Sequence, residues 1–146
     1  MSASAQIREL VQTSLLGRTI DVATFMDALL EIASAAGEIR CCLADDNGLR
    51  FELPGDETCE VEIDAARSKL RMLCARLSVL CNETPGSAVS PYGGVGVIRV
   101  QSQNGNGATQ PQWTVRFKNT PGEHEFTVTP TMAESPPIAA KRRAAT

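Results

Sequence analysis

The chain has 146 residues, of which 42% are hydrophobic and 21% are charged, and its formal net charge is −3 at pH 7. This length fits one domain that can bury its own core, and the composition is that of an ordered globular protein. So small a net charge gives no general attraction to nucleic acid or anionic lipid. No stretch approaches the roughly 20 apolar residues of a membrane span, and residues 1–6 lack the features of a secretory signal. We therefore expect a soluble, cytoplasmic protein that binds neither nucleic acid nor membrane.

Helical periodicity marks the N-terminal part of the chain. In residues 5–16, apolar side chains recur three and four positions apart, which predicts an amphipathic helix. A second helix is expected over residues 22–36, with Asp21 as its N-cap and Gly37 at its end. Because only a few residues separate the two helices, they should form a helical hairpin.

The period then changes to two, which is typical of β-strands. Residues 39–44 and 49–54 alternate between apolar and polar side chains on either side of Asn47-Gly48, a strong signal for a β-hairpin. Residues 59–64 continue the alternation and predict a third strand with an acidic outer face.

The longest helix is expected over residues 65–81, with Asp64 as its N-cap. It has a broad apolar stripe for the core and, on another side, a second apolar strip formed by Met72, Ala75 and Val79. Lys69 and Arg76 lie beside this strip, and all five residues form a possible interface. A helix that is apolar on two sides needs two covers. The second cover could be the N-terminal hairpin or another protomer, and the pattern does not choose between them.

Three further strands should follow a connection rich in proline, glycine and serine. They are expected at residues 95–100, 113–118 and 125–129. The pattern stops after Pro130. The sequence thus predicts an α+β protein with an N-terminal helical hairpin, an antiparallel β-sheet structure of about six strands and one long central helix, in the order α-α-β-β-β-α-β-β-β. We expect a single domain over residues 1–130 and a disordered tail over residues 131–146.

No pattern predicts a catalytic, cofactor-binding or metal site. The glycine-rich segment Tyr92–Gly96 precedes a strand rather than a helix, so it lacks the helix N-terminus of a phosphate-binding loop. The five cysteines contain no C-x-x-C pair, and we interpret them as buried structural thiols. An enzyme would need His124, the single histidine, as a base for Cys41, Cys42 or Cys59. We expect no enzyme and no cofactor.

The outer face of the last strands carries basic residues. Arg99, Arg116 and Lys118, together with the tail segment 141–143, could contact an anionic partner. No aromatic residue is interleaved with them on this outer face, as base stacking would require. Acidic residues on neighbouring strands favour cross-strand charge pairing instead.

These features predict a small non-enzymatic protein-interaction module, such as an adaptor, a chaperone-like protein or a complex subunit, and we expect it to be homodimeric. The order of its elements is similar to that of small dimeric folds such as the secretion chaperones and the roadblock type of dynein light chain, although this similarity involves no motif. The alternative is a small-molecule-binding or sensory domain with an apolar pocket between the sheet and the helices.

Overall fold

A computed structural model describes residues 2–16, 19–45, 47–83, 88–99 and 111–132 of the chain. The described residues form helices and strands in the expected order. In chain order the elements are α1 (Ala3–Ser14), α2 (Val22–Ala36), β1 (Ile39–Asp45), β2 (Gly48–Leu53), the short 3-10 turn η1 (Pro54–Asp56), β3 (Glu57–Glu62), α3 (Ala66–Asn82), β4 (Gly93–Arg99), β5 (Pro111–Thr120) and β6 (Glu123–Met132). The predicted α+β class and element order are confirmed.

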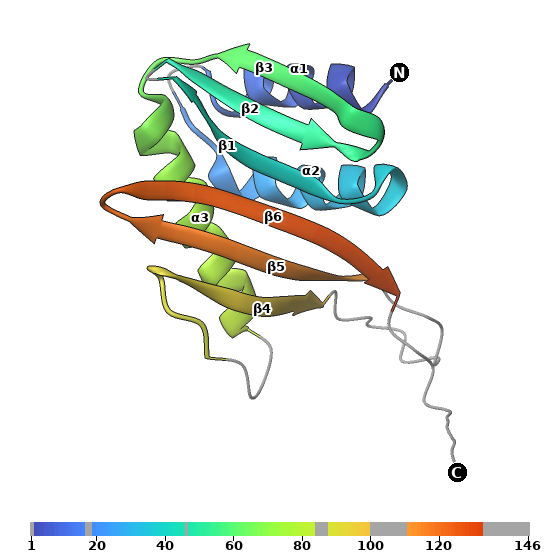
Figure 1. Cartoon of the computed structure of the whole chain (residues 1–146), viewed down its shortest axis with the longest axis vertical. Coiled ribbons are helices and arrows are strands. Elements are labelled where there is room, and N and C mark those ends of the chain that lie inside the picture. The colour runs from blue at the N-terminus through green and yellow to red at the C-terminus, as the bar shows by residue number, and fades with distance from the viewer. Residues whose placement is uncertain (1, 17–18, 46, 84–87, 100–110, 133–146) are drawn as a thin grey trace.

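The six strands form one antiparallel sheet in the order β3-β2-β1-β6-β5-β4 (Figure 1). Each half of the chain supplies three neighbouring strands. The halves meet where β1 pairs with β6, with Cys41 opposite Phe126. The last strand of the chain therefore lies at the centre of the sheet.

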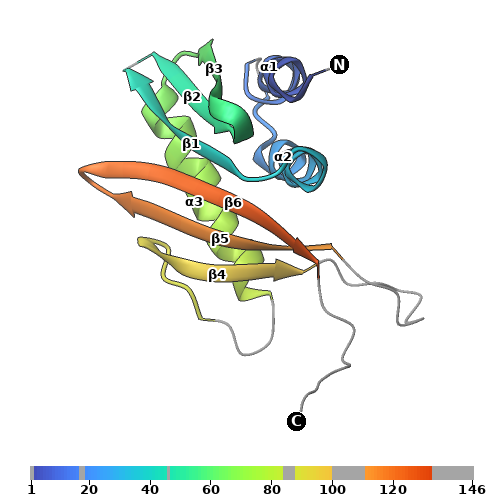
Figure 2. The same ribbon diagram turned by 45° about the vertical axis from the view of Figure 1, so that its right-hand side comes forward.

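The described helices all lie on one face of this sheet, and the other face is open (Figures 1 and 2). Helix α1 packs against β3 and α2, α2 packs against β6 and α3, and α3 crosses behind most of the strands. The core lies between the two layers. Both layers contribute large, fully buried side chains to it, including Phe25, Leu29, Phe51, Leu73 and Phe126. The protein is thus a two-layer structure with one solvated sheet face.

Local contacts explain how the helices are held. The carboxylate of Asp21 caps α2, as expected, by accepting a hydrogen bond of 3.0 Å from the backbone N–H of Thr24. The indole of Trp113 in β5 donates to the backbone carbonyl of Leu30 in α2 at 2.9 Å, which fixes this helix over the sheet. At Gly96 in β4, an added Cβ would lie 2.8 Å from the sulfur of Cys81, so the close approach of α3 requires glycine there.

Several elements begin or end a few residues from the expected positions, and two of these differences concern a helix cap and a proline. Asp64 does not cap α3, because the N-cap is Ala65, which adopts a left-handed conformation (φ 56°) and provides no side-chain hydrogen bond. The last strand does not stop at Pro130, since β6 continues to Met132. Pairing between β1 and β6 ends at Val128, so no ladder on that side needs the N–H that Pro130 lacks. Residues 133–146, where we expect disorder, lie outside the described residues.

Candidate functional site

The apolar strip Met72/Ala75/Val79 lies on the side of α3 that faces away from the sheet. Met72 is 42% exposed, Val79 is 51% exposed, and Ala75 between them is also exposed. On the opposite side of the helix, Leu73 and Leu77 are fully buried. The N-terminal hairpin, one of the two possible covers, therefore does not cover this strip. Helices α1 and α2 pack beside α3 on the sheet rather than over it.

Four cations border the strip. Helical spacing puts Lys69 and Arg76 on one flank of the strip and Arg67 and Arg71 on the other. No acidic residue occurs between the first and last residues of α3. None of the four side chains forms an ion pair within the described ranges. We call this surface, the strip and its four cations, the α3 outer face.

A pocket of about 610 Å³ opens beside the α3 outer face, where α2, the end of α3 and the ends of β4 and β5 come together. Its lining consists of Asp27, Leu30, Glu31, Ser34, Leu80, Glu83, Ile98, Arg99, Pro111 and Trp113. The apolar side chains form the floor, since Leu30, Ile98 and Trp113 are almost completely buried. An apolar pocket between the sheet and the helices is what the alternative function of the sequence analysis requires.

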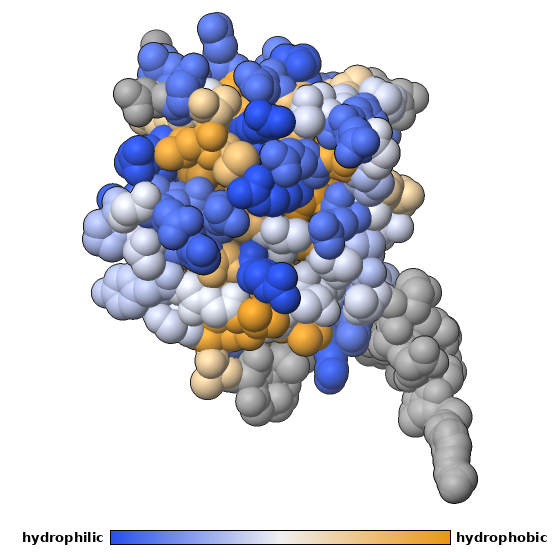
Figure 3. Space-filling model, in the orientation of Figure 1, coloured by the Kyte–Doolittle hydropathy of each residue, from blue (hydrophilic) through white to orange (hydrophobic). Residues whose placement is uncertain are grey.

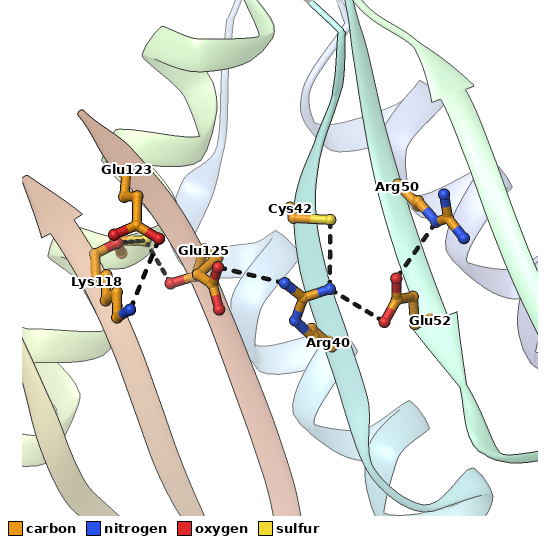
Figure 4. Close-up of polar contacts among 8 residues, drawn as sticks. Arg40, Cys42, Arg50, Glu52, Lys118, Glu123 and Glu125 are labelled. Atoms are coloured by element: carbon orange, nitrogen blue, oxygen red, sulfur yellow. Dashed lines mark hydrogen bonds and ion pairs between the residues drawn. The ribbon is translucent and has the colours of Figure 1, made fainter. Parts of the chain in front are cut away.

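The open face of the sheet carries most of the ion pairs of the described residues (Figure 4). Arg40 on β1 bridges two strands, with one guanidinium nitrogen 3.1 Å from Glu52 on β2 and another 3.3 Å from Glu125 on β6. Arg50 extends this network through Glu52 at 3.4 Å and Glu60 at 3.9 Å. In the space-filling view of this face, hydrophilic side chains separate small apolar patches (Figure 3). The charges of Arg40 and Arg50 are thus paired with carboxylates within the sheet.

The basic residues expected on the last strands do not form one patch. Lys118 pairs with Glu123 across the β5–β6 turn at 3.6 Å, as cross-strand pairing predicts. Arg99 lies opposite Gln112, at the far end of the β4–β5 pair from Lys118, and it lines the pocket. Arg116 is exposed between these two positions. The basic tail segment 141–143 lies outside the described residues.

His124 is buried on the helix side of the sheet, with its Nδ1 3.0 Å from the side-chain oxygen of Asn119. Burial, helped by the positive charges of Arg67 and Arg71, lowers the pKa of His124. Cys42 lies on the open face instead, within 3.7 Å of Arg40. The structure therefore does not place Cys42 beside this histidine.

The other cysteines belong to the packed interior. Cys59 in β3 contacts α1, where its thiol lies 3.6 Å from the backbone carbonyl of Ser4. Burial raises the pKa of Cys74 to about 12 and that of Cys81 to about 11, and it raises the pKa of Cys41 well above the ordinary thiol range. These three thiols stay protonated at neutral pH, which agrees with a structural role.

Comparisons with protein-family models and curated proteins found no match. No helix in the described part of the chain is long and apolar enough to cross a membrane. Among the described residues, no group of His, Cys, Asp and Glu side chains is arranged to hold a metal ion.

Sequence reasoning missed the carboxylates at the pocket. Asp27 and Glu31 lie four residues apart on α2, and Glu83 follows α3. The spacing of Asp27, Leu30, Glu31 and Ser34 was a signal that these residues share one stripe of a helix. It could not reveal that Glu83 and Trp113 lie opposite that stripe.

Proposed function

We propose that the protein is a non-enzymatic interaction module that binds an acidic, amphipathic helical segment of another protein through the α3 outer face. The observation that supports this proposal is an exposed apolar strip on a packed helix, bordered on both flanks by cations without ion-pair partners among the described residues.

The apolar part of this surface suits a helical partner. Met72 and Val79 are separated by two helical turns, so their side chains form one row along α3. Side chains of a second helix could pack on both sides of this row, with Ala75 allowing a close approach. Methionine also adapts its shape to different partners. An amphipathic partner helix would present its own apolar side chains at the same helical spacing.

The charges select the kind of partner. Carboxylates on the partner could pair with Arg67 and Arg71 on one flank and with Lys69 and Arg76 on the other. Rim pairs of this kind contribute about 0–1 kcal/mol each, but they accelerate association and reject partners of the wrong charge. A second copy would bring the same four cations to the interface, so self-association through α3 is disfavoured by repulsion. The homodimer expected from the sequence stays a prediction.

Two designed helical peptides would test the proposal. Both carry the same row of leucines, and one has glutamates on its flanks where the other has lysines. Titrated into isotope-labelled protein, the glutamate peptide should bind at least about tenfold more tightly and shift the amide signals of α3. Equal affinity of the two peptides, or signal changes confined to other elements, would refute the proposed surface.

A matched pair of substitutions separates this surface from general hydrophobic binding. Val79→Glu should abolish binding of the glutamate peptide, whereas Val95→Glu on β4, at a side chain that is 57% exposed, should leave it unchanged. Light scattering after size-exclusion chromatography gives the oligomeric state of the same proteins. A dimer that Val79→Glu dissociates would assign the α3 outer face to a second copy and contradict the acidic partner.

A further inference from the structure

The pocket between α2, α3, β4 and β5 has two chemically distinct parts. Its floor is apolar, with Leu30, Ile98 and Trp113 exposed by only 4%, 5% and 3%. The indole N–H of Trp113 is already used by the carbonyl of Leu30, so this ring offers the pocket only its carbon surface. A volume of about 610 Å³ is in the range of small-molecule sites. The floor therefore suits the apolar part of a ligand.

The rim of the pocket is acidic. Asp27, Glu31 and Glu83 contribute three carboxylates, and Arg99 is the single cation among the lining residues. None of the three carboxylates has an ion pair within the part of the chain that the structure describes. The rim thus has an excess of negative charge beside a surface that excludes water.

Two features of this rim are unfavourable without a ligand. Asp27 and Glu31 are like charges four residues apart on α2, an arrangement that destabilises a helix. Glu83 is the C-cap of α3, where the helix dipole favours a cation rather than an anion. A bound cation near these three carboxylates would relieve both costs. Elsewhere in the protein, carboxylates such as Glu52 and Glu125 lie beside arginines of the same chain.

We infer that this pocket binds a small amphipathic organic cation, such as an arylalkyl ammonium ion. Its apolar part would lie against Leu30, Ile98 and Trp113, and its ammonium group would lie among Asp27, Glu31 and Glu83. Charge-assisted hydrogen bonds from the ammonium to these carboxylates give the selectivity for a cation. This inference is independent of the partner proposed for α3, because it uses different side chains.

Three fragments that differ in their polar group would test the inference: 2-phenylethylammonium, the neutral 2-phenylethanol and the anion 3-phenylpropanoate. Trp113 is the only tryptophan of the chain, so its indole N–H signal reports directly on the pocket floor. In titrations of the full chain, the ammonium ion should bind about tenfold more tightly than the alcohol, and the anion should bind most weakly. Equal affinities for the three fragments would overturn the inference.

The substitution pair Asp27→Asn and Glu31→Gln keeps the shape of the rim and removes two charges. Combined in one variant, it should weaken binding of 2-phenylethylammonium by about tenfold and leave binding of 2-phenylethanol unchanged. Glu60→Gln with Glu62→Gln on β3 removes the same charge far from the pocket and should change neither affinity. If both variants weaken the ammonium complex equally, the selectivity comes from net charge and the assigned site is wrong. All four substituted residues are exposed, and an unchanged affinity for 2-phenylethanol would show that the pocket floor is intact.

Discussion

The open face of the sheet and the α3 outer face both carry arginines, but they use them differently. On the sheet, Arg40 has two carboxylate partners on neighbouring strands, and Arg50 extends the same network. On the helix, the cations have no ion-pair partner among the described residues, and they surround exposed apolar side chains instead. The number of charges is therefore a poor guide to a binding surface. What distinguishes the two is whether the fold itself neutralises the charges.

This contrast has a structural origin. Residues opposite each other on neighbouring strands point to the same face, so a strand with glutamates lies within reach of a strand with arginines. A helix whose charged residues are all basic, as in α3, cannot form such pairs along its own length. Its charges have to be neutralised by solvent ions or by another molecule. Among the described residues, the cations of the α3 outer face are thus not neutralised by the fold, whereas Arg40 and Arg50 on the sheet are.

The largest expected effect separates the two sides of α3. Leu73→Ala should lower the free energy of unfolding by about 2–5 kcal/mol, because Leu73 is fully buried and the cavity would lie inside the core. Met72→Ala, one residue earlier, should change it by about 0.5 kcal/mol or less. Urea unfolding of both variants measures the difference. A cost at Met72 as large as that at Leu73 would mean that the strip is covered in solution.

A second, smaller effect concerns the thiols on the inner side of the helix. Burial raises the pKa of Cys74 from 9.0 to about 12, so the folded state holds this proton more tightly than the unfolded state. The stabilisation is complete below pH 9 and is lost as the pH rises towards 12. By pH 10 the loss should be on the order of 1 kcal/mol for this thiol.

Urea unfolding at several pH values between 8 and 11 would measure this loss. Cys74→Ala should have a flatter dependence on pH than the natural protein, whatever its stability at neutral pH. A dependence that is unchanged in this variant would show that Cys74 does not ionise on unfolding in this range. The matched control is Cys42→Ala, at a half-exposed residue on the open face of the sheet. This substitution should alter the pH dependence of stability less than Cys74→Ala does.

The smallest effect compares single arginines on the two surfaces. Arg40→Gln removes the cation between Glu52 and Glu125 and should cost about 1 kcal/mol, a modest value because these side chains are about one-third exposed. Arg71→Gln on α3 should change stability by about 0.5 kcal/mol or less, since no ion pair is lost. Thermal unfolding at low and high salt checks both. A larger cost for Arg71→Gln would contradict the description of the α3 outer face as unpaired.

Much of the fold could be predicted from local sequence. The periods of 3.6 and 2 located the three helices and six strands that the described residues form, and Asp21 and Asn47-Gly48 marked a helix start and a hairpin. The N-cap of α3 was missed because Ala65 adopts a left-handed conformation. Alanine rarely adopts this conformation, so the sequence contains no sign of it. The end of β6 was missed because Pro130 normally breaks a strand, and only its position beyond the β1 pairing permits it.

Of the two candidate sites, one was visible in the sequence and the other was not. The second apolar strip of α3 was visible as a pattern, since helical periodicity assigns each residue of an element to a side. Whether that side is covered depends on where α1 and α2 pack, and the sequence left this open. The pocket was not visible as a set of residues, because Asp27 in α2, Glu83 after α3 and Trp113 in β5 come together only in the folded chain.

The sequence by itself determined which elements form, in what order, and which residues of each share a side, because these properties depend on neighbours within a few positions. Only the tertiary structure decided that β1 and β6 join the two halves of the sheet, that the helices share one face, and that Met72 and Val79 stay exposed. These features depend on the packing of segments that are far apart in the chain. Their energies are sums over many weak contacts, so no local pattern encodes them.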